Sequence, residues 1–224
     1  MRATMTPQQI ADHFSKRFEG QISDISVREW AEGTKKVPIR SVWMRIPREQ
    51  IIDAVRELVA IDYPHLGVVS AVDCGDIIEL LYHMQVFFGG RHEEIEIIFT
   101  VPIPKNDPHV PTITEVIPGA VYTEREKQDM IGVIVDGIPD NRRIFLPVDF
   151  PEGVYPWRKD EKGIPDSMIK ELWRVGRPEG RPSPAVKVIE KPERVQAISS
   201  GDSTGPVNPP EKQGEELLGG EKNE

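Results

Sequence analysis

The sequence predicts an α+β fold: an antiparallel sheet with helices packed on one face, followed by an extended proline-rich C-terminal segment. Strand-like stretches follow one another with short turns between them, which favours antiparallel pairing. Apolar residues at helical spacing mark two segments that would bury one side on such a sheet. Prolines then crowd the chain over residues 137–165, where periodic apolar runs are few.

Two amphipathic helices are expected in the first third of the chain. Residues 6–18 place apolar side chains on one side, and Thr6 followed by Pro7 suits a helix N-terminus. Residues 48–62 carry an apolar stripe with charged residues opposite. The stripe of this second helix is Ile51, Ile52, Val55, Leu58 and Val59.

Five strands are expected around these helices. Their residues are largely β-branched, aromatic or alternating apolar and polar. Turns at Gly33 and at Gly89-Gly90 separate neighbouring strands, so hairpins are expected. His83, inside the fourth strand, is interpreted as a structural histidine with satisfied hydrogen bonds. The expected strands are residues 21–31, 37–47, 65–74, 77–88 and 93–104.

Two more helices are expected after the last strand. Thr112 and Glu115 have the spacing of a capping box, which predicts a short helix ending at Ile117. A further helix is expected over residues 120–131, with Gly132 as its C-terminal cap.

Residues 124–129 form an unbroken polar run within this last helix. The simplest interpretation is a solvated helix face with ion pairs. However, no apolar residue falls between Thr123 and Asp129, so two turns are polar on every side. This pattern favours a helix surrounded by polar contacts. Its carboxylates could pair with Arg142 and Arg143, within the chain or across an interface.

The C-terminal part changes in character. A short helix is expected over residues 166–174, but the last 50 residues contain no aromatic side chain. Such a segment buries too little apolar surface to fold alone, so we expect it to order on partners. The predicted regions are an N-terminal helix (1–20), an α+β core (21–135), an extended docking segment (136–175) and an extended or disordered tail (176–224).

Composition excludes several classes of protein. The net charge of −9 argues against nucleic-acid binding. Cys74, the single cysteine, allows neither an intramolecular disulfide nor a four-thiolate metal site, and it is expected to be a partly buried strand residue. No stretch approaches the roughly 18 apolar residues that span a bilayer, so a partner would have to hold the protein at a membrane.

The sequence contains no motif that marks a catalytic, cofactor-binding or metal-ligating residue. Nucleotide-binding glycine loops and nucleophile elbows are absent, and the histidines lack metal-ligand spacing. One enzymatic alternative is an acid–base hydrolase that acts without partners. Its carboxylates would be Glu124, Glu126 and Asp129, with Arg142 or Arg143 as an anion clamp.

A set of motifs around the polar helix resembles the family of the 30-kDa subunit of respiratory complex I. That family includes the corresponding subunits of archaeal membrane-bound energy-converting [NiFe]-hydrogenase-like complexes. The resemblance covers roughly residues 35–162. The motifs that carry it are Tyr82-His83, Pro111-Thr112-Ile113-Thr114, Glu124-Arg125-Glu126, Asp129-Met130-x-Gly132, Gly137-x-Pro139-Asp140, Arg142-Arg143, Leu146-Pro147, Asp149 and Arg158-Lys159-Asp160.

The resemblance implies a subunit without its own redox centre in the hydrophilic arm of a membrane complex. Its expected partners are the large catalytic subunit and the iron–sulfur subunits, which would carry iron–sulfur clusters and, in hydrogenases, a nickel–iron centre. The expected location is the cytoplasmic side of the membrane. The residues expected to dock on partners are Glu124, Arg125, Glu126, Asp129, Asp140, Arg142, Arg143, Arg158, Lys159 and Asp160.

Departures from the family pattern indicate which branch the chain resembles. Ile138 stands where the family usually has histidine, and Trp157 stands where it usually has leucine. These changes favour a divergent hydrogenase-like or sulfur-reducing complex. The alternatives are the corresponding 30-kDa subunit of an NADH- or other donor:quinone oxidoreductase and a soluble adaptor outside any membrane complex.

Overall fold

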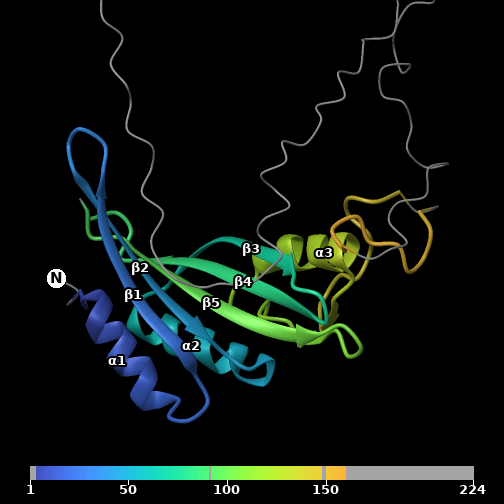
Figure 1. Cartoon of the computed structure of the whole chain (residues 1–224), viewed down its shortest axis with the longest axis horizontal. Helices are drawn as coiled ribbons and strands as arrows, with labels where there is room; N and C mark the ends of the chain where they lie inside the picture. Colours follow the sequence, from blue (N-terminus) through green and yellow to red (C-terminus); the bar gives the residue numbers. More distant parts are fainter. Residues whose placement is uncertain (1–3, 91, 148–149, 160–224) are drawn as a thin grey trace, which may run out of the picture. The chain divides into compact units, whose positions relative to one another are not determined.

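Five strands form the main sheet, in the order β1-β2-β5-β4-β3 (Figure 1). The structure, a computed structural model, describes residues 4–90, 92–147 and 150–159, all within the first of two compact units, Met1–Lys170. The expected helix at 166–174 and the tail at 176–224 lie outside the described residues. The strands are β1 (Ser23–Glu32), β2 (Val37–Arg45), β3 (His65–Asp73), β4 (Ile77–Val86) and β5 (Ile95–Pro104).

The α+β class is confirmed, with one correction to the strand pairing. β1 and β2, β4 and β5, and β3 and β4 pair antiparallel. β2 and β5 instead run parallel, with Ser41 opposite Glu96 and Arg45 opposite Thr100. The expectation of a wholly antiparallel sheet is therefore wrong at this pair. Between β2 and β5 the chain passes through α2 (Ile51–Ile61) and the β3–β4 hairpin. This connection is long enough for β5 to pair with β2 in the parallel direction, which a short turn would not allow.

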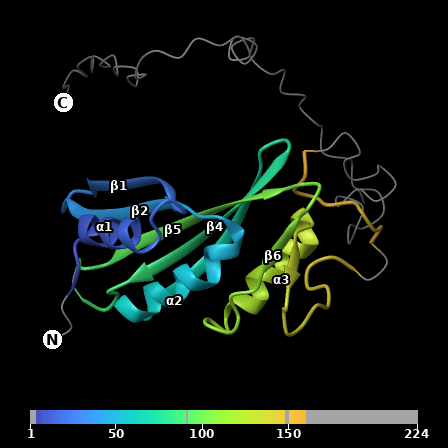
Figure 2. The ribbon, with the colours of Figure 1, turned by 90° about the horizontal axis from the view of Figure 1, so that it is seen from below.

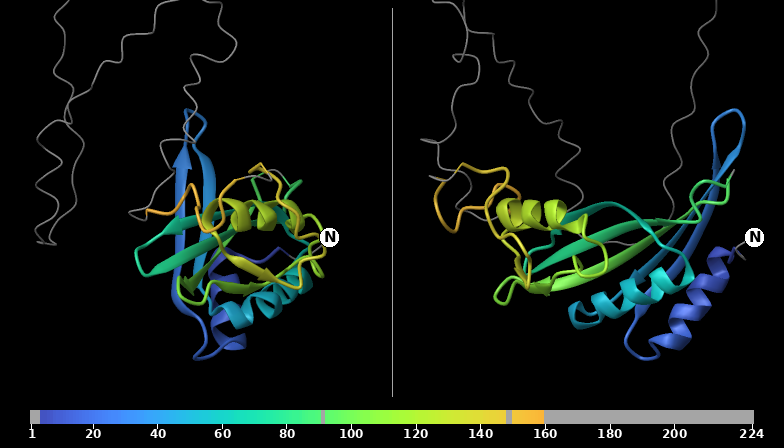
Figure 3. Two further views of the ribbon diagram at one scale, coloured as in Figure 1. Left: turned by 90° about the vertical axis from the view of Figure 1, so that its right-hand side faces the viewer. Right: turned by 180° about the vertical axis from the view of Figure 1, so that it is seen from behind.

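Helices α1 (Pro7–Arg17) and α2 (Ile51–Ile61) cover one face of the sheet (Figure 3). At the start of α1, Thr6 and Gln9 form a reciprocal capping box, which explains why the helix begins at Pro7. A 3-10 turn, η1 (Arg48–Gln50), leads into α2. The residues that α2 buries are Ile51, Ala54, Val55 and Leu58.

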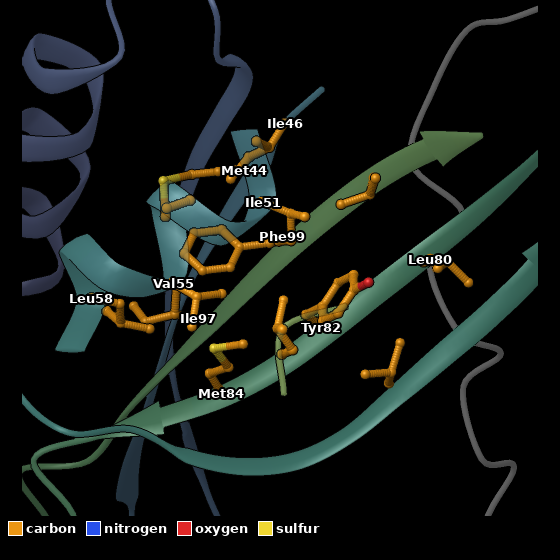
Figure 4. Close-up of a cluster of buried hydrophobic side chains, with 14 of the residues drawn as sticks. Met44, Ile46, Ile51, Val55, Leu58, Leu80, Tyr82, Met84, Ile97 and Phe99 are labelled. Carbon is orange, nitrogen blue, oxygen red and sulfur yellow. The ribbon is translucent and has the colours of Figure 1, made fainter. Parts of the chain in front are cut away.

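The core lies between these helices and the sheet (Figure 4). Tyr82 of β4 and Phe99 of β5 are opposite each other in the register, and both are buried. The ring centroid of Phe99 lies 5.6 Å from that of Phe14 on α1, which ties the N-terminal helix into the same core. Each such ring contributes about 2 kcal/mol through burial.

The predictions for His83, in β4, and Cys74, after β3, have different outcomes. His83 is satisfied as expected, because its Nε2 lies 3.0 Å from the Ser70 hydroxyl and its Nδ1 lies 3.0 Å from Glu96 Oε1. Cys74 is exposed, immediately after β3 ends. The expectation that it is a partly buried strand residue is wrong.

Helix α3 (Ala120–Ile131) lies beside β3, at the edge of the sheet. The Thr123 hydroxyl accepts a hydrogen bond from the Val69 amide at 3.0 Å and donates to the Val69 carbonyl at 3.3 Å. The helix thus occupies backbone groups that an unpaired edge strand would expose. Both ends of α3 agree with the prediction, and Gly132 follows in the left-handed conformation at φ 74°.

A small parallel sheet also flanks α3. It consists of β6 (His109–Pro111) and β7 (Ile134–Asp136), and Figure 2 shows β6 beside α3. These three-residue strands were not expected, because they are too short to show periodicity in the sequence. They bring the chain before α3 and the chain after it to the same side of the domain.

Candidate functional site

The polar residues of α3 are mostly buried. Glu124 and Lys127 are each 2% exposed, and Arg125 and Asp129 are also buried. The prediction of a helix surrounded by polar contacts is confirmed, and the solvated helix face is excluded for these four side chains. Buried ionised groups need partners, so their contacts define what the helix does.

Arg125 holds the extended segment that follows β7. We call residues 137–147 the strap. Arg125 Nε lies 2.8 Å from the carbonyl oxygen of Arg142, and its Nη2 lies 3.3 Å from that of Arg143. Its Nη1 lies 3.1 Å from Asp140 Oδ2. One guanidinium therefore binds three points of the strap.

Asp129, one turn along α3, holds the next part of the strap. Its Oδ2 accepts from the backbone amides of Ile144 at 2.8 Å, Phe145 at 2.9 Å and Leu146 at 3.4 Å. Consecutive amides that converge on one carboxylate fix the local backbone, since a charged acceptor strengthens each bond. Ile144 and Phe145 are nevertheless exposed, Phe145 to 60%.

The strap's own arginines do not pair with the carboxylates of the helix. Arg142 binds Asp140 through Nε at 2.9 Å and Nη2 at 2.7 Å, and these bonds hold the pKa of Asp140 well below its ordinary value. Arg143 donates to the carbonyl oxygens of Pro147 and Phe150. The expected pairing of both arginines with helix carboxylates is therefore wrong within the chain, and pairing across an interface stays a prediction.

Glu124 holds the segment that precedes α3. Its carboxylate accepts from the Thr112 hydroxyl at 2.6 Å and from the Ile113 amide at 2.9 Å. Burial raises the pKa of Glu124, and these two bonds oppose the rise. Because Thr112 is engaged with Glu124 and Glu115 is exposed, no capping box forms. The expected short helix is instead a turn.

The C-terminal end of α3 is capped by residues 155–159, which we call the clasp. Arg158 donates through Nε to the Ile131 carbonyl at 2.8 Å and through Nη2 to the Gly132 carbonyl at 3.1 Å. The Trp157 amide donates to the Met130 carbonyl at 2.9 Å. These bonds satisfy carbonyls that a helix end leaves without partners.

Lys159 and Asp73 fasten the clasp to the end of β3. The Lys159 amide lies 2.8 Å from Asp73 Oδ2, and its Nζ lies 3.1 Å from the Asp73 carbonyl oxygen. Burial alone would raise the pKa of Asp73, but bonds from Lys105, Lys159 and Gly75 outweigh it and lower this pKa to about 2. Asp73 and Lys105 carried no signal in the sequence, because their partners lie far along the chain. Asp160 lies outside the described residues.

The two remaining helix residues pair beside the clasp. Glu126 forms an ion pair with Lys127, whose Nζ also lies 4.7 Å from the centroid of the Trp157 ring. The lysine is thus buried between a carboxylate and an aromatic face. Of the nine expected docking residues within the described part of the chain, each has at least one intramolecular contact.

A hollow of about 480 Å³ opens where α3, the strap and the chain after it meet. Its walls are mostly polar, and they bring together residues from segments that are separate in the sequence. The lining residues are Gln128, Asp129, Val133, Ile134, Asn141, Arg143, Leu146, Glu152, Gly153, Val154 and Tyr155.

The described residues contain neither a cluster of metal-ligating side chains nor a membrane-spanning helix. Within them, nowhere do three or more His, Cys, Asp or Glu side chains gather as they would around a metal ion. Across the same residues, no helix has both the length and the apolar character needed to cross a bilayer. What the arrangement can do is present a fixed backbone segment to its surroundings.

Fold and site together define a class of protein: an α+β domain whose buried ionised groups hold a proline-containing strap against one helix. The sequence matches the family described as the 30-kDa subunit of respiratory-chain NADH dehydrogenase over residues 44–166. The chain belongs to this family, as its motifs indicated.

Relatives of the chain come from two kinds of complex. It is 32% identical over 164 residues to the membrane-bound hydrogenase subunit beta of Pyrococcus furiosus, covering 73% of this chain and 90% of that protein. It is 40% identical over 101 residues to an NADH-quinone oxidoreductase subunit of Acidothermus cellulolyticus, covering 44% of this chain and 50% of that protein.

A solved structure shares the fold. It belongs to the membrane-bound sulfane sulfur reductase, an archaeal respiratory membrane complex. The match has a TM-score of 0.55 at 20% identity and covers 79% of this chain and 98% of that one. At this identity the likeness extends to the fold alone.

Proposed function

We propose that this chain is a cofactor-free, hydrophilic-arm subunit of a membrane-bound complex I-like oxidoreductase. The complex is an energy-converting hydrogenase or a related sulfur-reducing enzyme. The chain docks on the large catalytic subunit. By helping the complex to assemble, it supports electron transfer coupled to ion translocation. Iron–sulfur clusters, and a nickel–iron centre in a hydrogenase, belong to partner subunits. The partners hold the chain at the cytoplasmic side of the membrane.

The observation that carries this proposal is the match to the Pyrococcus furiosus subunit, which extends over 90% of that protein. The match to the relative from the NADH-quinone oxidoreductase covers only 50% of that protein. Similarity along nearly the whole length favours the hydrogenase-like complex. The corresponding subunit of a donor:quinone oxidoreductase is the second candidate, supported by the 40% identity within the shared region.

The strap supports a docking role on physical grounds. Arg125 and Asp129 fix its backbone before any partner binds, so docking loses little conformational entropy. In this proposal the charged residues position the docking surface, and the exposed strap side chains contact the partner. The same geometry disfavours the hydrolase alternative, because Glu124 and Asp129 are buried and bound to groups of their own chain.

The test is to express the full chain with an affinity tag in its source organism and to purify it from washed, detergent-solubilised membranes. We expect one large subunit, together with iron–sulfur subunits, to copurify in fixed stoichiometry. The complex should oxidise hydrogen or reduce sulfur compounds, and the chain expressed alone should bind no metal or flavin. Catalytic turnover by the isolated chain, or its recovery only from the soluble fraction, would overturn the proposal. Quinone reduction alone would select the second candidate.

A further inference from the structure

Arg143 has different partners from Arg125 and Arg142, the two arginines that pair with Asp140. Arg125 and Arg142 both contact the carboxylate of Asp140. Arg143 makes no ion pair with any described residue, because its guanidinium donates only to the carbonyl oxygens of Pro147 and Phe150. Its positive charge is exposed on the surface of a protein whose net charge is −9.

The neighbouring side chains are apolar and exposed. Phe145 is 60% exposed and Ile144 is 36% exposed, although their amides are held by Asp129. Large aromatic side chains are frequent interface hot spots. Because the backbone that carries Phe145 is already fixed, binding a partner costs less conformational entropy. The cation and the aromatic group are two residues apart on one rigid segment.

The hollow beside the strap gives the cation an accessible position. Arg143 lines it together with Leu146 and Tyr155. Two carboxylates also lie in its walls. Asp129 is occupied by three backbone amides, whereas Glu152 is exposed and would favour a basic group instead. Among the described residues, Arg143 therefore lines the hollow without an ion-pair partner, and Glu152 is a carboxylate that could compete with an incoming acid.

We propose that Arg143 and Phe145 are the partner-contacting residues of the strap. Arg143 binds an acidic side chain of the large subunit in the hollow, and Phe145 enters an apolar pocket beside that acid. An arginine fork pairs with a carboxylate through two parallel hydrogen bonds, which fixes orientation as well as charge. This inference rests on the proposed function, since it names the surface by which that partner is bound.

The test compares how much large subunit each tagged variant retains from washed, solubilised membranes. The test variants are Arg143→Gln, Arg143→Lys and Phe145→Ser. Matched controls at the other end of the domain are Arg17→Gln and Trp30→Ser, whose side chains are 59% and 44% exposed. The thermal unfolding of every purified variant is measured alongside.

We expect Arg143→Gln and Phe145→Ser each to reduce the retained large subunit about tenfold at unchanged thermal midpoint, since charged and aromatic hot spots have effects of this size. Arg143→Lys should retain more than Arg143→Gln, because it keeps the charge. Both controls should behave as wild type. A drop in midpoint matching the loss of partner would assign Arg143 a merely structural role and overturn the inference.

Glu152→Gln separates the two possible charges of the partner group. If an acid enters the hollow, removing this carboxylate should leave binding unchanged or strengthen it. Loss of the large subunit from Glu152→Gln, with Arg143→Gln unaffected, would overturn the inference in favour of a basic group. Wild-type retention by all variants would overturn it while leaving the proposed function intact. No retention by the wild type would overturn both.

Discussion

Arg125 and Asp129 lie one turn apart on α3 and bind opposite kinds of backbone group in one segment. Arg125 binds the carbonyl oxygens of residues 142 and 143, and Asp129 binds the amides of residues 144–146. Positions i and i+4 lie on the same side of a helix, so the pair forms a continuous polar track for an extended chain. A helix used in this way presents charges where a core-packing helix would present apolar residues.

Replacing Asp129 should release the strap while leaving the sheet folded. In Asp129→Ala the three amides lose their acceptor, which lowers the free energy of unfolding by about 1–3 kcal/mol. Asp129→Asn keeps one oxygen without the charge and should have a smaller effect. Asp53→Ala, at an exposed aspartate of α2, is the control and should change the free energy by less than about 0.5 kcal/mol.

The measurement is amide hydrogen exchange of Ile144 and Phe145, with urea unfolding for the global value. We expect their protection to fall strongly in Asp129→Ala while that of β4 and β5 stays as in wild type. Equal protection of these two amides in wild type and Asp129→Ala would show that the carboxylate does not hold the strap.

Local features explain which elements could be predicted from the sequence. The bounds of α3 follow from its start after Pro118-Gly119 and from Gly132 at its end, and the main strands follow from their apolar and β-branched composition. The parallel contact of β2 with β5 could not be predicted in this way, because periodicity carries no information on strand order. Thr112 shows the same limit, since its capping-box spacing is local and its actual partner Glu124 is twelve residues away.

The candidate site was also predicted only in part from the sequence. An all-polar helix correctly predicted polar burial, but composition could not identify the partners of each charge. Pairing of the helix carboxylates with Arg142 and Arg143 does not form within the chain, because Arg125 and Asp129 bind backbone groups, which every residue type supplies. Asp73 could not be predicted for the same reason, since Lys105 and the Lys159 amide meet it only in the fold.

Asp73 should make stability fall at acid pH. Its pKa is about 2 in the folded protein against an ordinary value of 3.8, so the folded state favours the ionised form. That stabilisation is present above pH 3.8 and is lost as the pH falls toward 2. The difference in pKa corresponds to about 2 kcal/mol. We expect Asp73→Asn to be less stable than wild type at pH 7, with the difference shrinking between about pH 5 and pH 2.

Urea unfolding of both proteins at pH 7, 4 and 2.5 measures this difference, with Asp53→Asn as the control for an exposed aspartate. A gap between wild type and Asp73→Asn that stays constant over this range would contradict the assigned role of the Asp73 carboxylate. Limited proteolysis after residue 147 gives a second readout, because Asp73 also fastens the clasp through Lys159.

Gly132 and Tyr155 should be coupled at the end of α3. Gly132 has φ +74°, and a Cβ there would overlap ring atoms of Tyr155. Gly132→Ala therefore combines the left-handed backbone penalty of about 1–2 kcal/mol with a steric clash. The matched control is Gly20→Ala, which has φ +75° but no atom within 4 Å of the new Cβ, so it should show the backbone penalty alone.

The double mutant separates the two effects, because Tyr155→Ala removes the ring that the new Cβ would meet. In that background Gly132→Ala should lower the free energy of unfolding by no more than Gly20→Ala does in wild type. In the wild-type background, Gly132→Ala should lower the free energy of unfolding by at least about 1 kcal/mol more than in the Tyr155→Ala background, since contacting residues show coupling energies of this size. Urea unfolding followed by tryptophan fluorescence measures all five proteins: wild type, the three single mutants and the double mutant. Additive effects would mean that the Tyr155 ring does not rest on Gly132 in solution, and the clasp would then be held by the contacts of Trp157, Arg158 and Lys159.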